Sequence, residues 1–261
     1  MSLPSVVARD VQKVYSGDRD VLALEKVSLN IGNGEFVSIL GPSGCGKSTF
    51  LRCVAGLESI TDGELFVEGR KVVGPPDHVG MVFQRDALLD WRTIEENIYL
   101  PIEFKGKARA DYREKAKQLL KLTGLSDFAD RYPRQLSGGM RQRASICRAL
   151  IDDPALLMMD EPFGALDAFT RDQMNVELQR IWMKTRNTVM FVTHGITEAV
   201  FLADRVVVFA PRPGRIIETL EITLPRPRPL DIRASAEFGR YCSRIRELFQ
   251  DMGIMKEENA A

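Results

Sequence analysis

Short apolar runs alternate along the chain with longer segments in which apolar residues recur every three or four positions. Nearly uninterrupted apolar runs are typical of parallel strands buried on both faces, and the segments between them predict covering helices. We therefore expect an α/β fold whose core is a parallel sheet. The runs are Phe36–Leu40, Ala155–Met159, Val189–Val192 and Arg205–Phe209.

The first part of the chain has a different pattern. Residues 7–33 and 63–73 form short strand-like pieces bounded by turn residues such as Asp62-Gly63 and Glu68-Gly69. Glycine and aspartate favour tight turns, so this pattern predicts an antiparallel β subdomain beside the parallel sheet.

The middle of the chain is mostly helical in pattern. Residues 88–136 have helical spacing, for example Asp111–Leu122, and Gly124 is a suitable helix stop. We expect a helical subdomain over approximately residues 88–154, inserted into a single domain that spans residues 1–261. No internal repeat suggests a second domain of the same kind.

A C-terminal extension is expected over approximately residues 211–261. Residues 225–229 alternate proline and arginine, which disfavours a helix and predicts an extended path. A closing helix follows, and it either packs on the domain or contacts a second subunit. Its apolar positions are Phe238, Tyr241, Ile245, Leu248 and Met252.

Composition narrows the class of partner. Lys plus Arg and Asp plus Glu both number 36, so no overall basic field favours nucleic acid. No apolar window approaches the 18 residues of a membrane span, and the N-terminus lacks a signal-peptide pattern. The four cysteines lack metal-site spacing and are expected to be free thiols in a reducing cytosol.

A phosphate-binding loop follows the first apolar run. Residues 41–48 fit G-x-x-x-x-G-K-[ST] in full, and a helix over about Lys47–Leu57 is expected to follow. Backbone N–H groups and the helix N-terminus favour phosphate, so we expect Lys47 to reach the β- and γ-phosphates and Ser48 to ligate Mg²⁺. Cys45 fills a slot that needs a small side chain; a reactive thiol is the alternative. The loop consists of Gly41, Pro42, Ser43, Gly44, Cys45, Gly46, Lys47 and Ser48.

Two adjacent carboxylates, Asp160 and Glu161, end the second apolar run. Carboxylates beside a buried strand are costly unless a cation lies nearby, and a metal bound to phosphates supplies one. We expect Asp160 to hold Mg²⁺, directly or through water, and Glu161 to orient or deprotonate the attacking water. Capping of the next helix is the alternative.

The sequence LSGGMRQR begins at Leu136. Ser137 is a good N-cap, and the glycines leave backbone N–H groups accessible. A plain helix cap would explain this motif alone. Its occurrence with the phosphate loop and the carboxylate pair predicts a second surface that contacts nucleotide.

Two further polar residues end apolar segments. Gln84 follows residues 79–83, and His194 follows the third run. Each would be structural in isolation. In the context of the other motifs, we expect Gln84 to contact metal or water and His194 to contact the γ-phosphate. His78 has no such context and receives no role.

The ordered motifs resemble those of the ATPase subunit of ATP-binding-cassette (ABC) transporters over about residues 7–224. The matching motifs are Walker A at 41–48, the Q-loop at Gln84, the signature at 136–139, Walker B at 156–160 with Glu161, the D-loop at 165–167 and the switch histidine at His194. The resemblance implies a P-loop NTPase fold, ATP and Mg²⁺ as cofactors, and ATP hydrolysis.

The resemblance also implies roles for particular residues. Glu161, His194 and Gln84 would be catalytic, and Ser48, Gln84 and Asp160 would ligate Mg²⁺. Tyr15 would stack on adenine, and Thr49 would contact the α-phosphate.

Head-to-tail pairing of two subunits follows from the same resemblance. ATP held by one subunit would then meet the other subunit's Ser137, Gly138, Gly139 and Asp167. Integral membrane permease subunits would be contacted near Gln84–Arg92, with Trp91 and Arg92 as candidates; a buried aromatic is the alternative for Trp91. A periplasmic or lipid-anchored solute-binding protein would complete the complex. The chain would be cytoplasmic, peripheral on the inner face of the membrane.

Two stretches are similar to the nitrate/sulfonate/taurine-type importers: residues 83–98, and the tail segments 212–217 and 224–228. This narrower resemblance implies import of such a solute. The sequence departs from that group at Asp90, where proline is usual, and at Gly195, where aspartate is common and would place a carboxylate beside His194.

Other classes of protein fit less well. Cassette ATPases of DNA repair or translation usually carry coiled-coil inserts or two cassettes, and neither occurs here. A kinase has no use for LSGG, and a GTPase would need an N-K-x-D motif. An exporter subunit is the nearest alternative to an importer.

Overall fold

The computed structural model describes residues 4–254 and divides them into two compact units. The first unit contains residues 4–76 and 190–254, and the second contains residues 77–189. Strand β8 (Thr188–Thr193) carries the chain from the second unit into the first.

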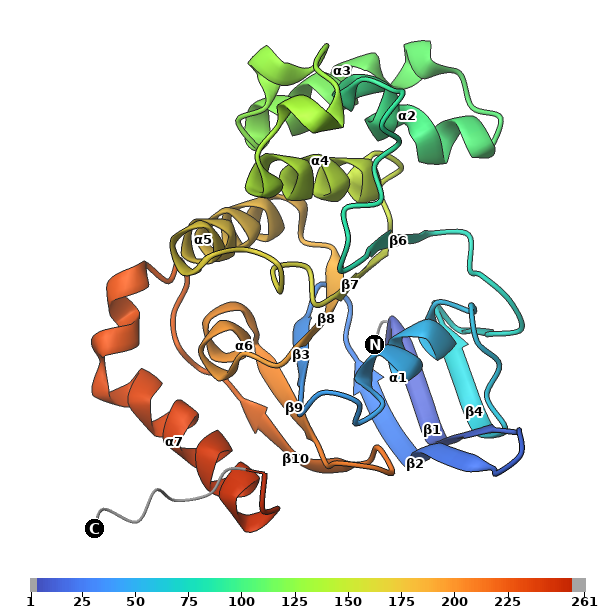
Figure 1. Ribbon diagram of the computed structural model, residues 1–261, viewed down its shortest axis with the longest axis vertical. Helices are drawn as coiled ribbons and strands as arrows, with labels where there is room; N and C mark the ends of the chain where they lie inside the picture. The colour runs from blue at the N-terminus through green and yellow to red at the C-terminus, as the bar shows by residue number, and fades with distance from the viewer. Residues whose placement is uncertain (1–3, 255–261) are drawn as a thin grey trace. The chain divides into compact units, whose positions relative to one another are not determined.

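An antiparallel sheet forms the early part of the first unit, as predicted (Figure 1). Val6 of the central strand β1 pairs with Ile31 on one side and Val67 on the other. Asp10, at φ 47°, interrupts the register and moves the buried face from Val6 and Ala8 to Val11. In spatial order the strands are β2 (Val21–Ile31), β1 (Val6–Tyr15), β4 (Asp62–Val67) and β5 (Arg70–Lys71).

The first unit also contains the strand that leads to the phosphate loop. All five residues of β3 (Phe36–Leu40) are buried, and the strand pairs in parallel with β9 (Arg205–Phe209). Strand β10 (Ile216–Glu221) pairs antiparallel with β9. Buried strands in parallel pairing confirm the interpretation of the apolar runs.

Helix α1 (Lys47–Val54) begins where the phosphate-loop motif predicts. It ends three residues earlier than expected, so the predicted end at Leu57 is wrong. The chain turns at Gly56, at φ 67°, in the left-handed conformation that commonly ends helices.

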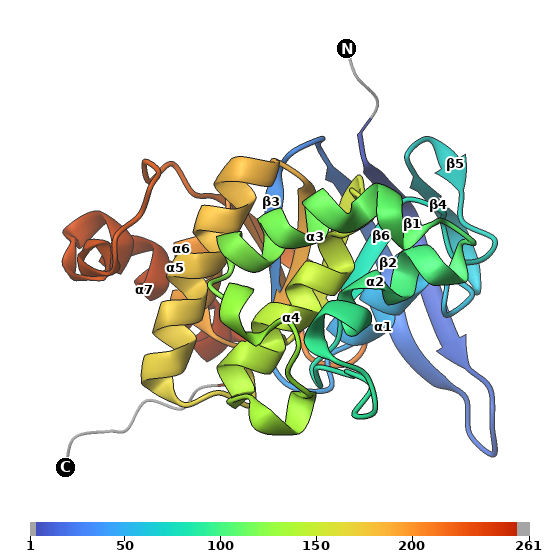
Figure 2. The same ribbon diagram turned by 90° about the horizontal axis from the view of Figure 1, so that it is seen from above.

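The second unit combines several helices, which lie in front in Figure 2, with a pair of parallel strands. Helices α2, α3 and α4 pack against one another. Thr93 and Glu96 form a capping box at the start of α2, and Gly124 follows α3 as predicted. The elements are β6 (Val79–Val82), α2 (Ile94–Phe104), α3 (Arg109–Leu122), η1 (Ser126–Phe128), η2 (Pro133–Gln135), α4 (Gly138–Leu150), β7 (Leu156–Asp160) and α5 (Ala168–Thr185).

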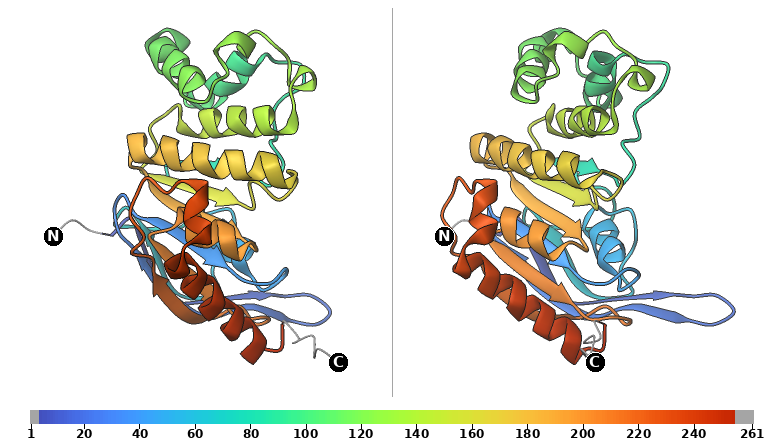
Figure 3. Two further views of the ribbon diagram at one scale, coloured as in Figure 1. Left: turned by 90° about the vertical axis from the view of Figure 1, so that its left-hand side faces the viewer. Right: turned by 60° about the vertical axis from the view of Figure 1, so that its left-hand side comes forward.

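The C-terminal extension ends in the predicted helix, α7 (Ala236–Asp251), after a short 3₁₀ turn, η3 (Leu230–Ala234). Helix α7 packs against α6 (Ile196–Leu202) of the same unit (Figure 3). The apolar side chains of Phe238, Ile245 and Leu248 are buried, which confirms the interpretation of a closing helix that packs on its own chain.

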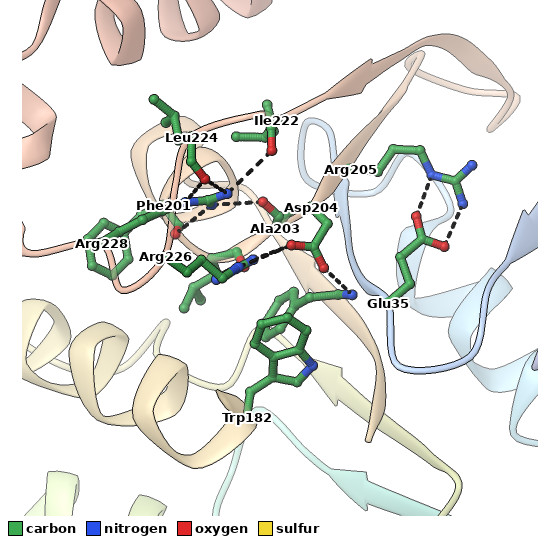
Figure 4. Close-up of polar contacts among 12 residues, drawn as sticks. Glu35, Trp182, Phe201, Ala203, Asp204, Arg205, Ile222, Leu224, Arg226 and Arg228 are labelled. Carbon is green, nitrogen blue, oxygen red and sulfur yellow. Dashed lines mark hydrogen bonds and ion pairs between the residues drawn. The ribbon is translucent and has the colours of Figure 1, made fainter. Parts of the chain in front are cut away.

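Hydrogen bonds from Arg228 attach the C-terminal extension to α6 (Figure 4). Its side chain is 1% exposed, and its Nη1 donates to the carbonyls of Val200, Phe201 and Ala203 at 3.0, 3.0 and 2.8 Å. Burial, followed by the neighbouring charge of Arg226, lowers the pKa of Arg228 to about 10. The guanidinium therefore stays charged at neutral pH and caps the carbonyls at the C-terminal end of α6.

Arg226 makes a second attachment, to the start of β3. Its Nη2 lies 2.8 Å from Oδ1 of Asp204, and Oδ2 of Asp204 accepts from the backbone N–H of Phe36 at 3.0 Å. Arg228 and Arg226 thus attach the proline-rich segment to α6 and to the start of β3, respectively.

Replacing Arg228 with methionine is expected to lower the free energy of unfolding by about 3 kcal/mol, because buried carbonyls lose their charged donor. Urea unfolding of the full chain measures this value. Arg240→Met is the control, since Arg240 is exposed; we expect a change below about 0.5 kcal/mol there. Equal stability of the two variants would contradict the capping role of Arg228.

Candidate functional site

The predicted phosphate loop lies between β3 and α1 in the first unit. Gly46 has φ 102°, and a Cβ there would lie 2.8 Å from the carbonyl oxygen of Ala23, so the position requires glycine. The Nζ of Lys47 donates to the carbonyls of Gly41 and Pro42 at 2.8 and 2.9 Å. The ammonium therefore lies inside the loop, where an oxygen of a bound phosphate would meet it.

Two other nucleotide-site candidates belong to the first unit. Cys45 is buried, with 1% of its surface exposed, which favours a packing role over a reactive thiol. Tyr15 ends β1 and is 36% exposed, and the Nζ of Lys13 lies 4.8 Å from its ring centroid. An exposed ring at this position remains available for stacking on a base.

His194 is exposed at the end of β8, also in the first unit. Gly195 is the residue before α6, and its N–H donates to Oγ1 of Thr193 at 3.0 Å. The hydroxyl of Thr193 donates in turn to the buried carboxylate of Glu198. A Cβ at Gly195 would lie 3.6 Å from Oε2 of Glu198, so a carboxylate lies beside this position although the aspartate common in the importer group is replaced.

The carboxylate pair lies at the end of β7 in the second unit. Asp160 is 9% exposed. Glu161 has φ 45°, a left-handed conformation that costs a non-glycine residue about 1–3 kcal/mol. Such a cost persists where the surrounding structure holds a residue in place, and it is common at functional sites.

The second unit brings Gln84 close to Glu161. A Cβ at Gly164 would lie 3.7 Å from Nε2 of Gln84 and 3.9 Å from Cβ of Glu161. The amide of Gln84 and the base of the Glu161 side chain therefore lie at the same turn.

The residues expected to act on a neighbouring subunit's nucleotide also lie together. Ser137 caps α4 by accepting from the N–H of Met140 at 3.3 Å, and Asp167 caps α5 by accepting from the N–H of Thr170 at 3.0 Å. This hydrogen bonding lowers the pKa of Asp167. A Cβ at Gly138 or Gly139 would contact Leu166 or Thr170, respectively, so the two helix N-termini adjoin.

Three residues that the sequence did not reveal hold the segment after Gln84. Arg148, near the end of α4, donates to the carbonyls of Asp86 and Ala87 at 2.7 and 2.6 Å. Arg141, one turn into α4, donates to Oδ2 of Asp86 at 2.9 Å. Helix α4 thus begins at the signature, and two of its arginines hydrogen-bond to the segment that follows Gln84.

Asn97 is the third of these residues. Its side chain is fully buried in α2, accepts from the N–H of Leu89 at 2.7 Å and donates to the carbonyl of Leu89 at 3.1 Å. It also donates to the carbonyls of Arg92 and Thr93 at 3.2 and 2.9 Å. A lone amide on an otherwise apolar helix face was the available signal.

Trp91 is 74% exposed, so the interpretation as a buried aromatic is wrong. Its neighbour Arg92 pairs with Glu103 at 2.6 Å. Asn97 binds the backbone of Leu89 and Arg92, on either side of Trp91. The exposed Trp91 side chain therefore lies on a loop whose backbone is fixed by hydrogen bonds.

The candidate metal ligands fit Mg²⁺ in kind. Ser48, Gln84 and Asp160 offer oxygen atoms, which this hard cation prefers. No group of three His, Cys, Asp or Glu side chains suited to a metal occurs in the part of the chain that the structure describes. Within residues 4–254, no helix is both long and apolar enough to span a bilayer.

Residues 24–164 match the ABC transporter family. An uncharacterized ABC transporter ATP-binding protein of Methanocaldococcus jannaschii is 47% identical, covering 91% of this chain and 87% of the relative. The taurine import ATP-binding protein TauB of Rhizobium johnstonii is 44% identical, with 88% and 90% covered. The aliphatic sulfonates import ATP-binding protein SsuB of Bacillus cereus is 39% identical, with 94% and 96% covered.

Two solved structures resemble this chain in fold. The dimeric structure of MJ0796, a bacterial ABC transporter cassette, has a TM-score of 0.73 and 34% identity, covering 84% of this chain and all of that one. A dimeric post-hydrolysis state of the same cassette, bound to ADP and Pi, matches equally well, with a TM-score of 0.73.

The two signature glycines are expected to differ in their effect on stability. A Cβ at Gly139 would lie 2.8 Å from Cγ2 of Thr170, whereas one at Gly138 would lie 3.6 Å from Leu166. We expect Gly139→Ala to lower the free energy of unfolding by about 1–2 kcal/mol and Gly138→Ala to leave it within about 0.5 kcal/mol. Thermal unfolding of both variants measures the difference. If Gly138→Ala proves the more destabilising, the packing assigned to this turn is incorrect.

Proposed function

This chain belongs to the ABC transporter family as an ATP-binding subunit that hydrolyses ATP, and we propose that it powers import of a small solute through a membrane permease. The observation that carries the proposal is similarity, over most of the chain, to ATP-binding subunits named for taurine import and aliphatic sulfonate import. Those names support import over an exporter, DNA repair or translation function. Taurine, an aliphatic sulfonate or nitrate is the proposed solute.

Within one subunit, the phosphate loop from Gly41 to Ser48, with Thr49, would bind the phosphates of ATP, and Tyr15 would stack on adenine. Lys47 already points its ammonium into the loop. Ser48, Gln84 and Asp160 would hold Mg²⁺, which neutralises charge on the β- and γ-phosphates when it is bound. Glu161 would orient and deprotonate the attacking water, with Gln84 beside it, and His194 would contact the γ-phosphate.

Pairing of two subunits would complete the site. Ser137, Gly138, Gly139 and Asp167 form one surface of the second unit, a placement that suits contact with a nucleotide held by a partner. Gly138 supports this role because its own chain leaves room for a Cβ. An absent side chain there is better explained by close approach of a ligand than by packing.

The segment Gln84–Arg92 is the proposed contact with the permease. Trp91 is exposed and lies on a loop that Asn97 holds. Arg148 connects the same segment to α4, whose first residues are the signature. A displacement of Trp91 by the permease would thus be transmitted to Gln84 and to the end of α4 that contacts nucleotide.

The remaining assignments are organisational. We place a helical subdomain at approximately residues 88–154 and a C-terminal extension at approximately 211–261 in a single cassette. A periplasmic or lipid-anchored solute-binding protein would deliver the solute, and the subunit would lie on the cytoplasmic face of the membrane. No nucleic acid takes part in the proposed cycle.

The function is tested by reconstituting the chain with its permease in proteoliposomes that contain the solute-binding protein. ATP hydrolysis is expected to rise when taurine, an aliphatic sulfonate or nitrate is added outside. Glu161→Gln should bind ATP normally, reduce hydrolysis by at least about 100-fold and accumulate as a dimer, because the base is lost while the phosphate contacts remain. Unchanged hydrolysis in that variant would remove Glu161 from the mechanism. Stimulation by none of the three solutes would refute the proposed cargo.

Trp91→Ala is expected to leave basal hydrolysis by the isolated subunit within about twofold of wild type and to reduce solute uptake by about tenfold, because an exposed aromatic anchor at an interface is lost. Uptake of labelled solute into the same proteoliposomes measures the effect. Phe104→Ala is the matched control, since Phe104 is 83% exposed but lies outside the proposed contact. Equal uptake by the two variants would argue against docking at Trp91.

A further inference from the structure

We propose that Arg212, in the turn between β9 and β10, is a positioning residue for ATP: it orients the peptide group between Gly44 and Cys45 so that the Cys45 N–H faces bound phosphate. The inference rests on the nucleotide site described above and adds a residue from outside the phosphate-loop motif.

Arg212 lies directly over the tip of the phosphate loop. Its Nε donates to the carbonyl oxygen of Gly44 at 2.9 Å. Its Nη2 lies 3.1 Å from the point that a Cβ would occupy at Gly44. Gly44 has φ 73°, so the absence of a Cβ both permits the turn and leaves room for the guanidinium.

The turn that carries Arg212 is itself held in place. The N–H of Gly214 donates to the carbonyl of Ala23, and the carbonyl of Gly214 accepts from the N–H of Glu25, both at 2.9 Å. A Cβ at Gly214 would lie 2.3 Å from the carbonyl oxygen of Cys45. The turn therefore packs against β2 and the phosphate loop together, and Arg212 extends from a fixed base.

Because Gly44 and Cys45 share a peptide group, the contact with Arg212 also sets the direction of an N–H that can donate to phosphate. A trans peptide is planar, and its C=O and N–H point in opposite directions. Fixing the Gly44 oxygen toward Arg212 consequently turns the Cys45 N–H the other way. That N–H lies 3.4 Å from the carbonyl of Pro42, the same oxygen that accepts from Lys47 inside the loop.

The Cys45 N–H is therefore directed to the region where phosphate would bind. At 3.4 Å its bond to Pro42 is long for a hydrogen bond, so exchange for a phosphate oxygen costs little. A charged donor on the far side of the peptide also increases the polarity of the N–H by cooperative polarisation. Arg212 thus prepares the loop for the nucleotide without touching it.

The experiment compares Arg212→Met with Arg215→Met in the full chain. Arg215 is the control: it belongs to the same turn and is exposed, and its side chain faces Glu25 at 3.7 Å and not the loop. Isothermal titration with AMP-PNP and Mg²⁺ measures affinity, and steady-state ATPase assays separate KM from kcat. Thermal unfolding checks that both variants fold.

Arg212→Met is expected to weaken AMP-PNP binding about fivefold and to raise KM for ATP similarly, with kcat within about twofold of wild type. In ¹⁵N spectra, the shift of the Cys45 amide on AMP-PNP binding should shrink in this variant. Arg215→Met should match wild type. Equal affinity of the Arg212 variant and wild type, or equal losses in both variants, would overturn the inference. If folded wild-type protein fails to bind AMP-PNP, the nucleotide site itself is refuted, which is a distinct result.

Discussion

Backbone carbonyls that lie outside regular hydrogen bonding are held by cationic side chains at each functional segment of this protein. A carbonyl that no helix or strand hydrogen bond pairs needs another donor. Lys47 supplies them within the phosphate loop, Arg212 at its tip, Arg148 in the segment after Gln84 and Arg228 at the end of α6. Arginine suits this task because its planar fork presents several donors in a fixed geometry.

As an energetic consequence, these loops are fixed by hydrogen bonds from charged side chains and not by apolar packing. A charged donor binds a carbonyl more strongly than a neutral one, yet the contact is a small number of bonds that can be exchanged. The ammonium of Lys47 illustrates this property, because the carbonyls that hold it compete with a phosphate oxygen for the same protons. Rigid apolar packing in these positions would hold the loops but leave nothing to exchange.

Helix α4 connects two functional segments of the second unit. Ser137 caps its start, and Arg148 lies two residues before its last residue, Leu150. An α-helix transmits displacement along its axis because its backbone bonds lie within it. Helix α4 therefore links the Gln84 segment and the signature by direct hydrogen bonds, as the proposed coupling to a permease requires.

Local patterns in the sequence were sufficient for the elements and the motifs. Strand β3 and the loop after it, the cap at Ser137, and the antiparallel strands all depend on residues close together in the chain. Apolar runs, turn glycines and cap residues record such short-range requirements directly. The end of α1 was misplaced because Gly56 stops the helix while apolar residues continue through Leu57.

Long-range contacts were decided only by the tertiary structure. Arg212 and Gly44 are 168 residues apart, and Arg148 and Asp86 are 62 apart. Their partners are backbone carbonyls, which every residue possesses, so no residue type in the sequence marks them. The exposure of Trp91 has the same cause, since an aromatic side chain looks alike in sequence whether the fold buries it or presents it. The sequence by itself determined the nucleotide chemistry through short motifs, and the tertiary structure decided which distant cations hold those motifs in working geometry.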